Sequence, residues 1–113
     1  MRIINEVCLN KDVDATLGAE TVYSDTIDLA HQAGYSLHLR VVKNGGVVAG
    51  NAISQKSNNG VNWIDVTTTA LTDTATQSIP IEVVDVFYRY VRLKVDLSTG
   101  VASFVADVMA KGF

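Results

Sequence analysis

Residues 53–66 read Ile-Ser-Gln-Lys-Ser-Asn-Asn-Gly-Val-Asn-Trp-Ile-Asp-Val and carry the strongest local structural signal in the chain. Two runs that can extend as strands flank Asn59-Gly60, a dipeptide that tolerates the positive φ of a tight hairpin turn. The second run contains Trp63, the single tryptophan. Because Trp63 is the largest apolar side chain available, we expect it to anchor the core. The stretch predicts a β-hairpin and contains nothing that performs chemistry.

The segments before this hairpin continue the β pattern. Tyr35–Lys43 alternates apolar and polar side chains, with Tyr35, Leu37, Leu39 and Val41 on one face, as in a half-buried strand. Asn44-Gly45-Gly46 predicts a second hairpin turn, with Val47–Gln55 as the returning strand. Nearer the C-terminus we expect a strand at 88–96, a turn at 97–100 and a closing strand at 101–110.

The remaining segments predict shorter or less regular pieces. Thr21–Tyr23 and Thr26–Leu29 are candidate short strands, and Thr67–Ser78 reads as a long connection or an irregular edge. Pro80 places the strand at 79–84 at an edge or at a strand start, because proline cannot donate to a sheet ladder. About eight strands without a convincing helix predict an all-β fold, an antiparallel, jelly-roll-like β-sandwich.

The first nineteen residues differ from the rest, because their apolar positions show no clean period. Ile3, Ile4, Val7 and Leu9 fit either an edge strand of the same domain or an extended arm that docks on another subunit. The edge strand is the simpler interpretation, since terminal segments are ordered only when they are tied down. We therefore divide the chain into an N-terminal arm or edge strand, 1–19, and a single β-sandwich domain, 20–113.

Composition narrows the function classes. The 113 residues are 48% hydrophobic and 19% charged, which fits one folded domain with a modest core. A formal net charge of −3 argues against a general nucleic-acid binder. The chain shows neither an apolar run long enough to span a bilayer nor a secretory signal, so we expect synthesis in a cytoplasm and no membrane partner.

The reactive residue types do not form a recognisable catalytic or metal pattern. His31 and His38 lack further ligands at metal-site spacing, and Cys8 lacks a neighbouring group that would activate it. No serine stands in a nucleophile-elbow sequence. We therefore expect no enzyme, no catalytic or metal-binding residue, no cofactor and no small-molecule substrate.

The most suggestive surface is the face on which Tyr88, Tyr90, Arg92 and Lys94 alternate. Aromatic and basic groups placed in this way could stack on a sugar, hold single-stranded nucleic acid or bury against a protein partner. An ordinary solvated sheet face would have the same sequence pattern. The overall acidity makes nucleic acid the weakest of the binding alternatives.

Five short pieces occur in an order that resembles a known family. They are Ser-Asp-Thr-Ile-Asp-Leu (24–29), Gly-Tyr-Ser-Leu (34–37), Ser-Asn-Asn-Gly-Val-Asn-Trp (57–63), Tyr-Arg-Tyr-Val-Arg-Leu (88–93) and Lys-Gly (111–112). The series resembles the small β-sandwich decoration, or cement, proteins on the capsids of tailed bacteriophages. The third and fourth pieces also resemble discoidin-like and carbohydrate-binding sandwiches.

The first resemblance implies a virion protein on the capsid exterior, a homotrimer that contacts the major capsid protein and stabilises the shell. It implies that the N-terminal residues Ile3, Ile4, Val7 and Leu9 and the face with Tyr88, Tyr90, Arg92 and Lys94 are interface candidates. The alternative is a carbohydrate- or receptor-binding module of a phage fibre or baseplate, using Tyr88 and Tyr90.

Overall fold

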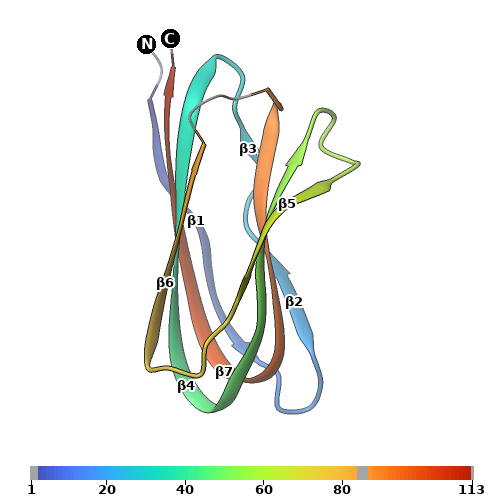
Figure 1. The fold of residues 1–113 in the computed structure, drawn as a ribbon, viewed down its shortest axis with the longest axis vertical. Helices are drawn as coiled ribbons and strands as arrows, with labels where there is room; N and C mark the ends of the chain where they lie inside the picture. Colours follow the sequence, from blue (N-terminus) through green and yellow to red (C-terminus); the bar gives the residue numbers. More distant parts are fainter. Residues whose placement is uncertain (1–2, 84–86, 113) are drawn as a thin grey trace.

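The computed structural model describes residues 3–83 and 87–112 (Figure 1). These residues form seven strands and no helix, so no helix able to cross a membrane occurs among them. The strands are β1 (Ile3–Asp14), β2 (Glu20–Tyr23), β3 (Ile27–Asp28), β4 (Gln32–Ser57), β5 (Ile64–Ala70), β6 (Thr76–Val83) and β7 (Tyr90–Gly112). Met1 of the predicted arm and Val84 of the predicted strand at 79–84 lie outside the described residues.

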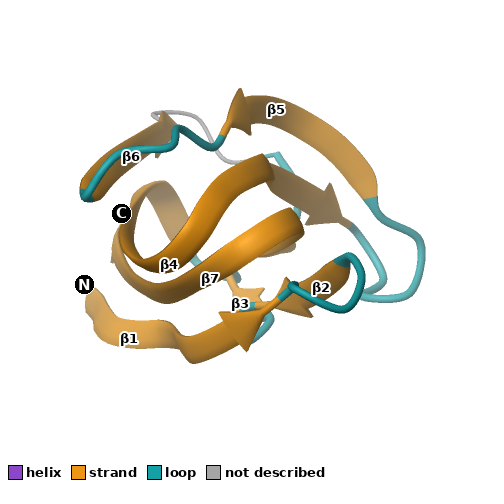
Figure 2. Ribbon diagram, turned by 90° about the horizontal axis from the view of Figure 1, so that it is seen from below, coloured by secondary structure: helices purple, strands orange, loops and turns teal. Residues whose placement is uncertain are grey.

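The two long strands, β4 and β7, each contribute to both layers of a sandwich. The β1 layer has the order β1, residues 101–112 of β7, residues 32–45 of β4, then β6. The β5 layer has the order β2 with β3, residues 90–99 of β7, residues 49–57 of β4, then β5. Figure 2 shows β4 and β7 between β1, β2 and β3 on one side and β5 and β6 on the other.

These pairings confirm the predicted antiparallel β-sandwich. When each half of β4 and of β7 is counted separately, two layers of four strand positions result, with β2 and β3 sharing one position. This neighbour order is the jelly-roll arrangement of two interlocked Greek keys. Every pairing in the described sheet is antiparallel.

The predicted hairpin at Asn44-Gly45-Gly46 is wrong, and so is the predicted turn at Leu97–Gly100. β4 keeps β7 as its neighbour on both sides of the glycines, and both strands bend over together at the end opposite the termini (Figure 1). The register between the two strands shifts three times between Lys43 and Gly50, which accommodates the bend. A local Gly-Gly signal specifies a change of direction, but it does not specify the partner of the returning segment.

Two glycines allow β4 and β7 to approach closely at the bend. Gly50 has a φ of 148°, and a Cβ placed on it would lie 1.9 Å from the backbone oxygen of Asp96. Gly100 has a φ of 89°, and its Cβ would lie 2.7 Å from the backbone oxygen of Val47. Any other residue at either position would meet both backbone strain and a backbone atom.

The core lies between the two layers. The predicted apolar face of Tyr35, Leu37, Leu39 and Val41 is buried, and His38 and Arg40 on the other face are exposed, as expected. On β7 the buried positions change from odd to even numbers at the bend: Val91, Leu93, Val95 and Leu97 precede it, and Ala102, Phe104, Ala106, Val108 and Ala110 follow it. The register shifts therefore keep the apolar side of both halves turned inward.

The edges of the sandwich differ in part from the prediction. Of the two interpretations of residues 67–78, the long connection is wrong in part, because the first four residues complete β5 and the last three begin β6. Both strands pair only with β4 among the described strands, which fits the alternative of an edge. β-branched threonines fit a strand well, which the interpretation of a Thr-rich connection ignored. Pro80 lies on β6, which pairs only with β4 among the described strands, so its predicted edge position is confirmed. β1 pairs with β7 along residues 3–14 as an edge strand of the same sheet.

Candidate functional site

The outer face of the β5 layer collects the polar and aromatic side chains of four strands. On β7, Val91, Leu93 and Val95 point into the core, so the alternate residues Tyr90, Arg92 and Lys94 point outward. The sequence therefore placed these three residues correctly on one face. Across the sheet, Arg92 is opposite Gln55 on β4, and Gln55 is opposite Asp65 on β5.

Arg92 lies at the centre of this face between two aromatic rings. Its guanidinium carbon is 4.3 Å from the centroid of the Tyr23 ring and 4.2 Å from that of the Trp63 ring. β2 supplies Tyr23 from one side, and the residue preceding β5 supplies Trp63 from the other. Each ring face attracts the cation, so the two contacts hold the guanidinium between β2 and the loop before β5.

Two hydrogen bonds in series also hold the Arg92 guanidinium, through Gln55 on β4 and Asp65 on β5. Arg92 Nε donates to Gln55 Oε1 at 2.8 Å, and Gln55 Nε2 donates to Asp65 Oδ1 at 2.7 Å. Gln55 is only 6% exposed, so its amide has little freedom to exchange these partners for water. We call Tyr23, Gln55, Trp63, Asp65 and Arg92 the Arg92 cluster.

The loop between β4 and β5 holds Trp63 in place. Ser57 Oγ accepts from the backbone N–H groups of Asn59 and Gly60, at 3.3 and 3.0 Å. Asn59 Oδ1 accepts from those of Val61 and Asn62, both at 2.9 Å. The predicted tight turn is wrong: Gly60 has a φ of 74°, but Asn59 does not have the positive φ that such a turn needs, so residues 58–63 form a wider loop and β5 begins at Ile64 and not at Val61. The predicted antiparallel pairing of the two flanking runs is confirmed, and the side chains of the loop fix its path.

The predicted role of Trp63 as core anchor is wrong. Trp63 is half-buried, is absent from the core cluster, and covers the outer face against Arg92. The space between the layers is filled instead by Phe104 and by aliphatic residues such as Leu39 and Leu93. Size alone assigned Trp63 to the core, although an indole can also use its face to bind a cation.

Arg92 has no carboxylate partner among the described residues. The ion pairs among the described residues involve other side chains. They join Lys43 to Asp73 at 2.7 Å, Arg89 to Asp28 at 3.1 Å and His38 to Asp107 at 3.9 Å. Asp65 is occupied by Gln55, and the terminal Nη groups of Arg92 have no hydrogen-bond acceptor within the described chain. The face thus holds a fixed cation with unused donors.

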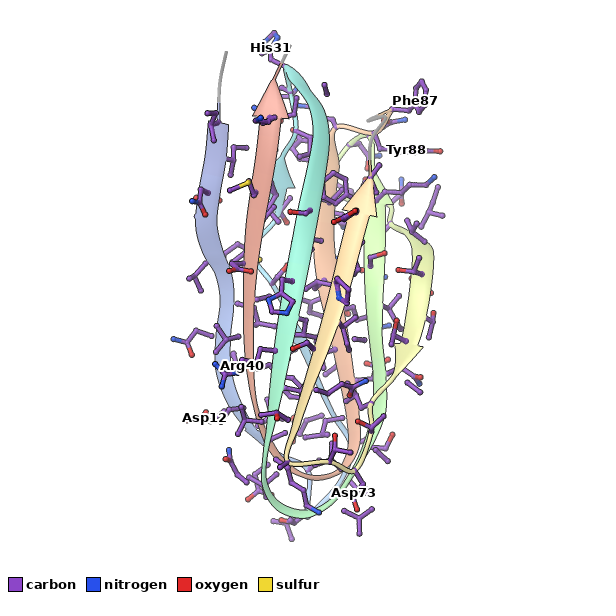
Figure 3. The ribbon with its side chains drawn as sticks, turned by 60° about the vertical axis from the view of Figure 1, so that its left-hand side comes forward. Asp12, His31, Arg40, Asp73, Phe87 and Tyr88 are labelled. Atoms are coloured by element: carbon purple, nitrogen blue, oxygen red, sulfur yellow. The ribbon has the colours of Figure 1, made fainter. Side chains whose placement is uncertain are left out.

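Tyr88 is separated from the rest of the predicted face. It precedes β7 and lies with Phe87 at the end of the sandwich near His31 (Figure 3). The Lys56 ammonium is 4.2 Å from the centroid of its ring. Lys56 and Tyr88 line an apolar pocket of about 120 Å³. Its other lining residues are Leu29, Tyr35, Val66, Val83, Phe87 and Val91. Tyr88 therefore does not share a surface with Arg92.

The apolar candidates on β1 also divide between two environments. Leu9 is buried in the core and Ile4 packs against it, whereas Ile3 and Val7 are about 60% exposed. A register shift between Val7 and Leu9 leaves Cys8 buried as well. Ile3 and Val7 keep the exposure that an interface requires, and their role at an interface stays a prediction.

The polar residues considered for chemistry do not converge. The described residues contain no group of three or more His, Cys, Asp or Glu side chains that could hold a metal ion. Burial raises the pKa of the Cys8 thiol from 9.0 to about 11, the largest contribution being loss of solvation. A thiol with such a raised pKa is a weak nucleophile at neutral pH.

Comparison with known proteins identifies the fold. No family model and no curated protein matches the chain. Among solved structures, the PBSX exported protein XepA is similar over 97% of this chain, with a TM-score of 0.70 and 14% identity. The chain spans 37% of the length of that protein.

Two further structures have the same architecture in different settings. An infectious bursal disease virus structure (Gx strain) matches 98% of this chain and 32% of its own, with a TM-score of 0.57 and 14% identity. The carbohydrate-binding module TmCBM61, solved with β-1,4-galactotriose, matches 99% of this chain and 88% of its own, with a TM-score of 0.54 and 15% identity. At these identities the likeness establishes the β-sandwich fold and leaves function to the residues.

Proposed function

We propose that the chain is a virion structural protein that binds the outer surface of a phage capsid and stabilises contacts between major capsid subunits. The Arg92 cluster carries this proposal. Tyrosine, tryptophan and arginine are the residue types that dominate the energetics of protein interfaces. Here one of each is held together on an outward face, and their rigid arrangement lowers the entropy cost of binding.

The proposed action is mechanical. A protein that binds assembled subunits more tightly than free ones shifts the equilibrium towards the assembled shell by mass action. A rigid sandwich suits this task, because a flexible clamp would transmit little of its binding energy to its partners. The proposal includes a homotrimer on the capsid exterior, and it assigns the protein no enzymatic reaction, cofactor, nucleic acid or membrane.

A sedimentation experiment tests the proposal. The purified protein is mixed with mature, expanded heads that lack it and, separately, with immature shells of the same phage. We expect saturable co-sedimentation with the mature heads only, because only they present the assembled contacts. Absence of binding to both particles would contradict the proposal. Analytical ultracentrifugation of the free protein tests the trimer separately, and a monomer at micromolar concentration would contradict that part.

A second candidate function is recognition of a glycan by a phage fibre or baseplate. The combination of aromatic and polar groups favours it: Tyr23 and Trp63 contact Arg92, which is hydrogen-bonded to Gln55, and Gln55 is hydrogen-bonded to Asp65. Sugar-binding sites combine aromatic faces with such hydrogen-bonding groups. Binding on a glycan array without affinity for capsids would select this function over the first.

A further inference from the structure

We propose that the Arg92 guanidinium receives a carboxylate side chain of the protein partner, held by its two terminal Nη groups. The inference rests on the proposed protein-binding function and names the chemistry that this face recognises. It starts from the terminal Nη donors of Arg92, which have no acceptor within the described chain and are not among its buried unpartnered atoms, so they are open to an incoming group.

The geometry favours an acceptor with two oxygens in one plane. The rings of Tyr23 and Trp63 lie 4.3 and 4.2 Å from the guanidinium carbon and restrict the approach of an incoming group. The hydrogen bond to Gln55 occupies Nε and leaves the terminal nitrogens available. Two parallel bonds from a planar fork match the two oxygens of a carboxylate.

The charges near the site favour a singly charged anion on a protein over a nucleic acid. Asp65 is linked to Arg92 through Gln55, and on the outward face of β7 the cation of Lys94 is followed by Asp96. The whole chain carries a net charge of −3. A polyphosphate backbone would meet repulsion from Asp65 and Asp96, whereas one carboxylate requires one cation.

A sugar is less well matched to the same place. Stacking of a sugar ring needs an open aromatic face, and the guanidinium covers one face of each ring. The site offers charged donors, the terminal Nη groups of Arg92, to an incoming acceptor. A glutamate or aspartate set among the side chains of a partner satisfies them and buries Tyr23 and Trp63 at the same time.

Trp63 provides a direct readout, because it is the only tryptophan in the chain and contacts Arg92. Its fluorescence is titrated with the blocked peptide acetyl-Gly-Glu-Gly-amide and, as a neutral match, with acetyl-Gly-Gln-Gly-amide. We expect a saturable change with the glutamate peptide at millimolar concentration and at least about tenfold weaker binding of the glutamine peptide, since charge-assisted hydrogen bonds are the stronger ones.

One variant separates the paired donors of Arg92 from its charge, and a second variant serves as a control. Arg92→Lys keeps the cation and loses the paired donors, so its affinity for the glutamate peptide should fall about tenfold, the loss of one charge-assisted bond. Arg40→Gln removes an exposed cation from the other face and should leave the titration unchanged. Circular dichroism of each variant verifies that it is folded.

Several outcomes would overturn the inference. They are equal responses to both peptides, no response to the glutamate peptide, an unchanged affinity in Arg92→Lys, or a response to a neutral oligosaccharide alone. The titration contains no capsids. A positive titration with no sedimentation on heads would refute the proposed function and leave the carboxylate site intact, and the reverse result would refute the carboxylate site alone.

Discussion

Arg40 and Arg92 occupy comparable places on the two outer faces of the sandwich. Each lies on a central strand of its layer, Arg40 on β4 and Arg92 on β7, and each points away from the core. Arg40 faces Val105 and Ser78 across the sheet and is exposed on the outer face of its layer (Figure 3). Arg92 is half-buried between two rings and bonded to Gln55.

The difference between the two arginines comes from their neighbours. Next to Arg40 the adjacent strands supply small or aliphatic side chains, so its guanidinium is left to water. Next to Arg92, β2 supplies a tyrosine and the loop before β5 supplies a tryptophan, so the guanidinium is fixed and partly desolvated. A charged side chain becomes a specific binding group when the surrounding fold removes its freedom at little cost. We therefore propose that the outer face of the β5 layer is the binding face.

The largest expected effect is on stability, and it concerns the bend of β4 and β7 that joins the two layers. Gly50→Ala should lower the free energy of unfolding by about 4 kcal/mol, because its Cβ overlaps the backbone oxygen of Asp96 and its φ becomes strained. Urea denaturation measures the change. Gly45→Ala is the matched control, since its Cβ meets no atom within 4 Å. Equal stability of the two variants would show that β4 and β7 are not in close contact at Gly50.

A smaller loss of stability should appear at high pH, because a thiol buried beneath the β1 layer ionises. The pKa of the Cys8 thiol is raised by burial from 9.0 to about 11. Because the folded-state pKa lies above the unfolded value, the contribution to stability is complete below pH 9 and is lost as the pH rises to 11. We expect a loss of about 1–2 kcal/mol over this window.

Urea denaturation at several pH values measures this loss. Burial also raises the pKa of Tyr35 above its ordinary value of 10.0, so Tyr35 adds to the pH dependence at high pH. Cys8→Ala isolates the thiol, because only the part of the slope due to Cys8 should disappear in that variant. The same slope in both proteins would mean that Cys8 is not buried in solution.

The smallest of these effects bears directly on the contrast between the arginines. A double-mutant cycle of Arg92→Ala and Trp63→Ala should give a coupling energy of about 1 kcal/mol, typical of a cation–π contact that is partly desolvated. Arg40→Ala combined with Trp63→Ala is the control cycle and should give additive effects, since the two residues lie on opposite layers. A coupling near zero in the first cycle would remove the difference on which our account depends.

The sequence predicted the elements better than their partners. The alternation at Tyr35–Val41 identified the buried face of β4 correctly, because side-chain direction in a strand is a local property. Asn44-Gly45-Gly46 gave a correct change of direction and a wrong hairpin, because the choice of neighbour is decided by residues far along the chain. At the bend, Gly50 and Gly100 allow each long strand to contact the backbone of the other, far along the chain.

The candidate site was predicted in part for the same reason. Arg92 was identified from the alternation of β7, but Tyr23, Gln55 and Asp65 were missed. Tyr23 and Gln55 contact Arg92 across strands that are distant in sequence, and Asp65 joins them through its hydrogen bond with Gln55 in the same hairpin. Trp63 was recognised as exceptional and assigned to the wrong side of the sheet. Tyr23, Trp63 and Arg92 lie in three separate segments of the chain, so no local sequence pattern could have brought them together.

The most direct test of the account compares the two arginines on the proposed target. Binding of the protein to mature heads is measured by sedimentation for the unaltered chain, for Arg92→Ala and for Arg40→Ala. We predict that Arg92→Ala binds at least about thirtyfold more weakly, the effect of removing an interface hot spot worth about 2 kcal/mol, and that Arg40→Ala binds as the unaltered protein does. Equal binding by all three proteins, or weaker binding by Arg40→Ala alone, would contradict the account.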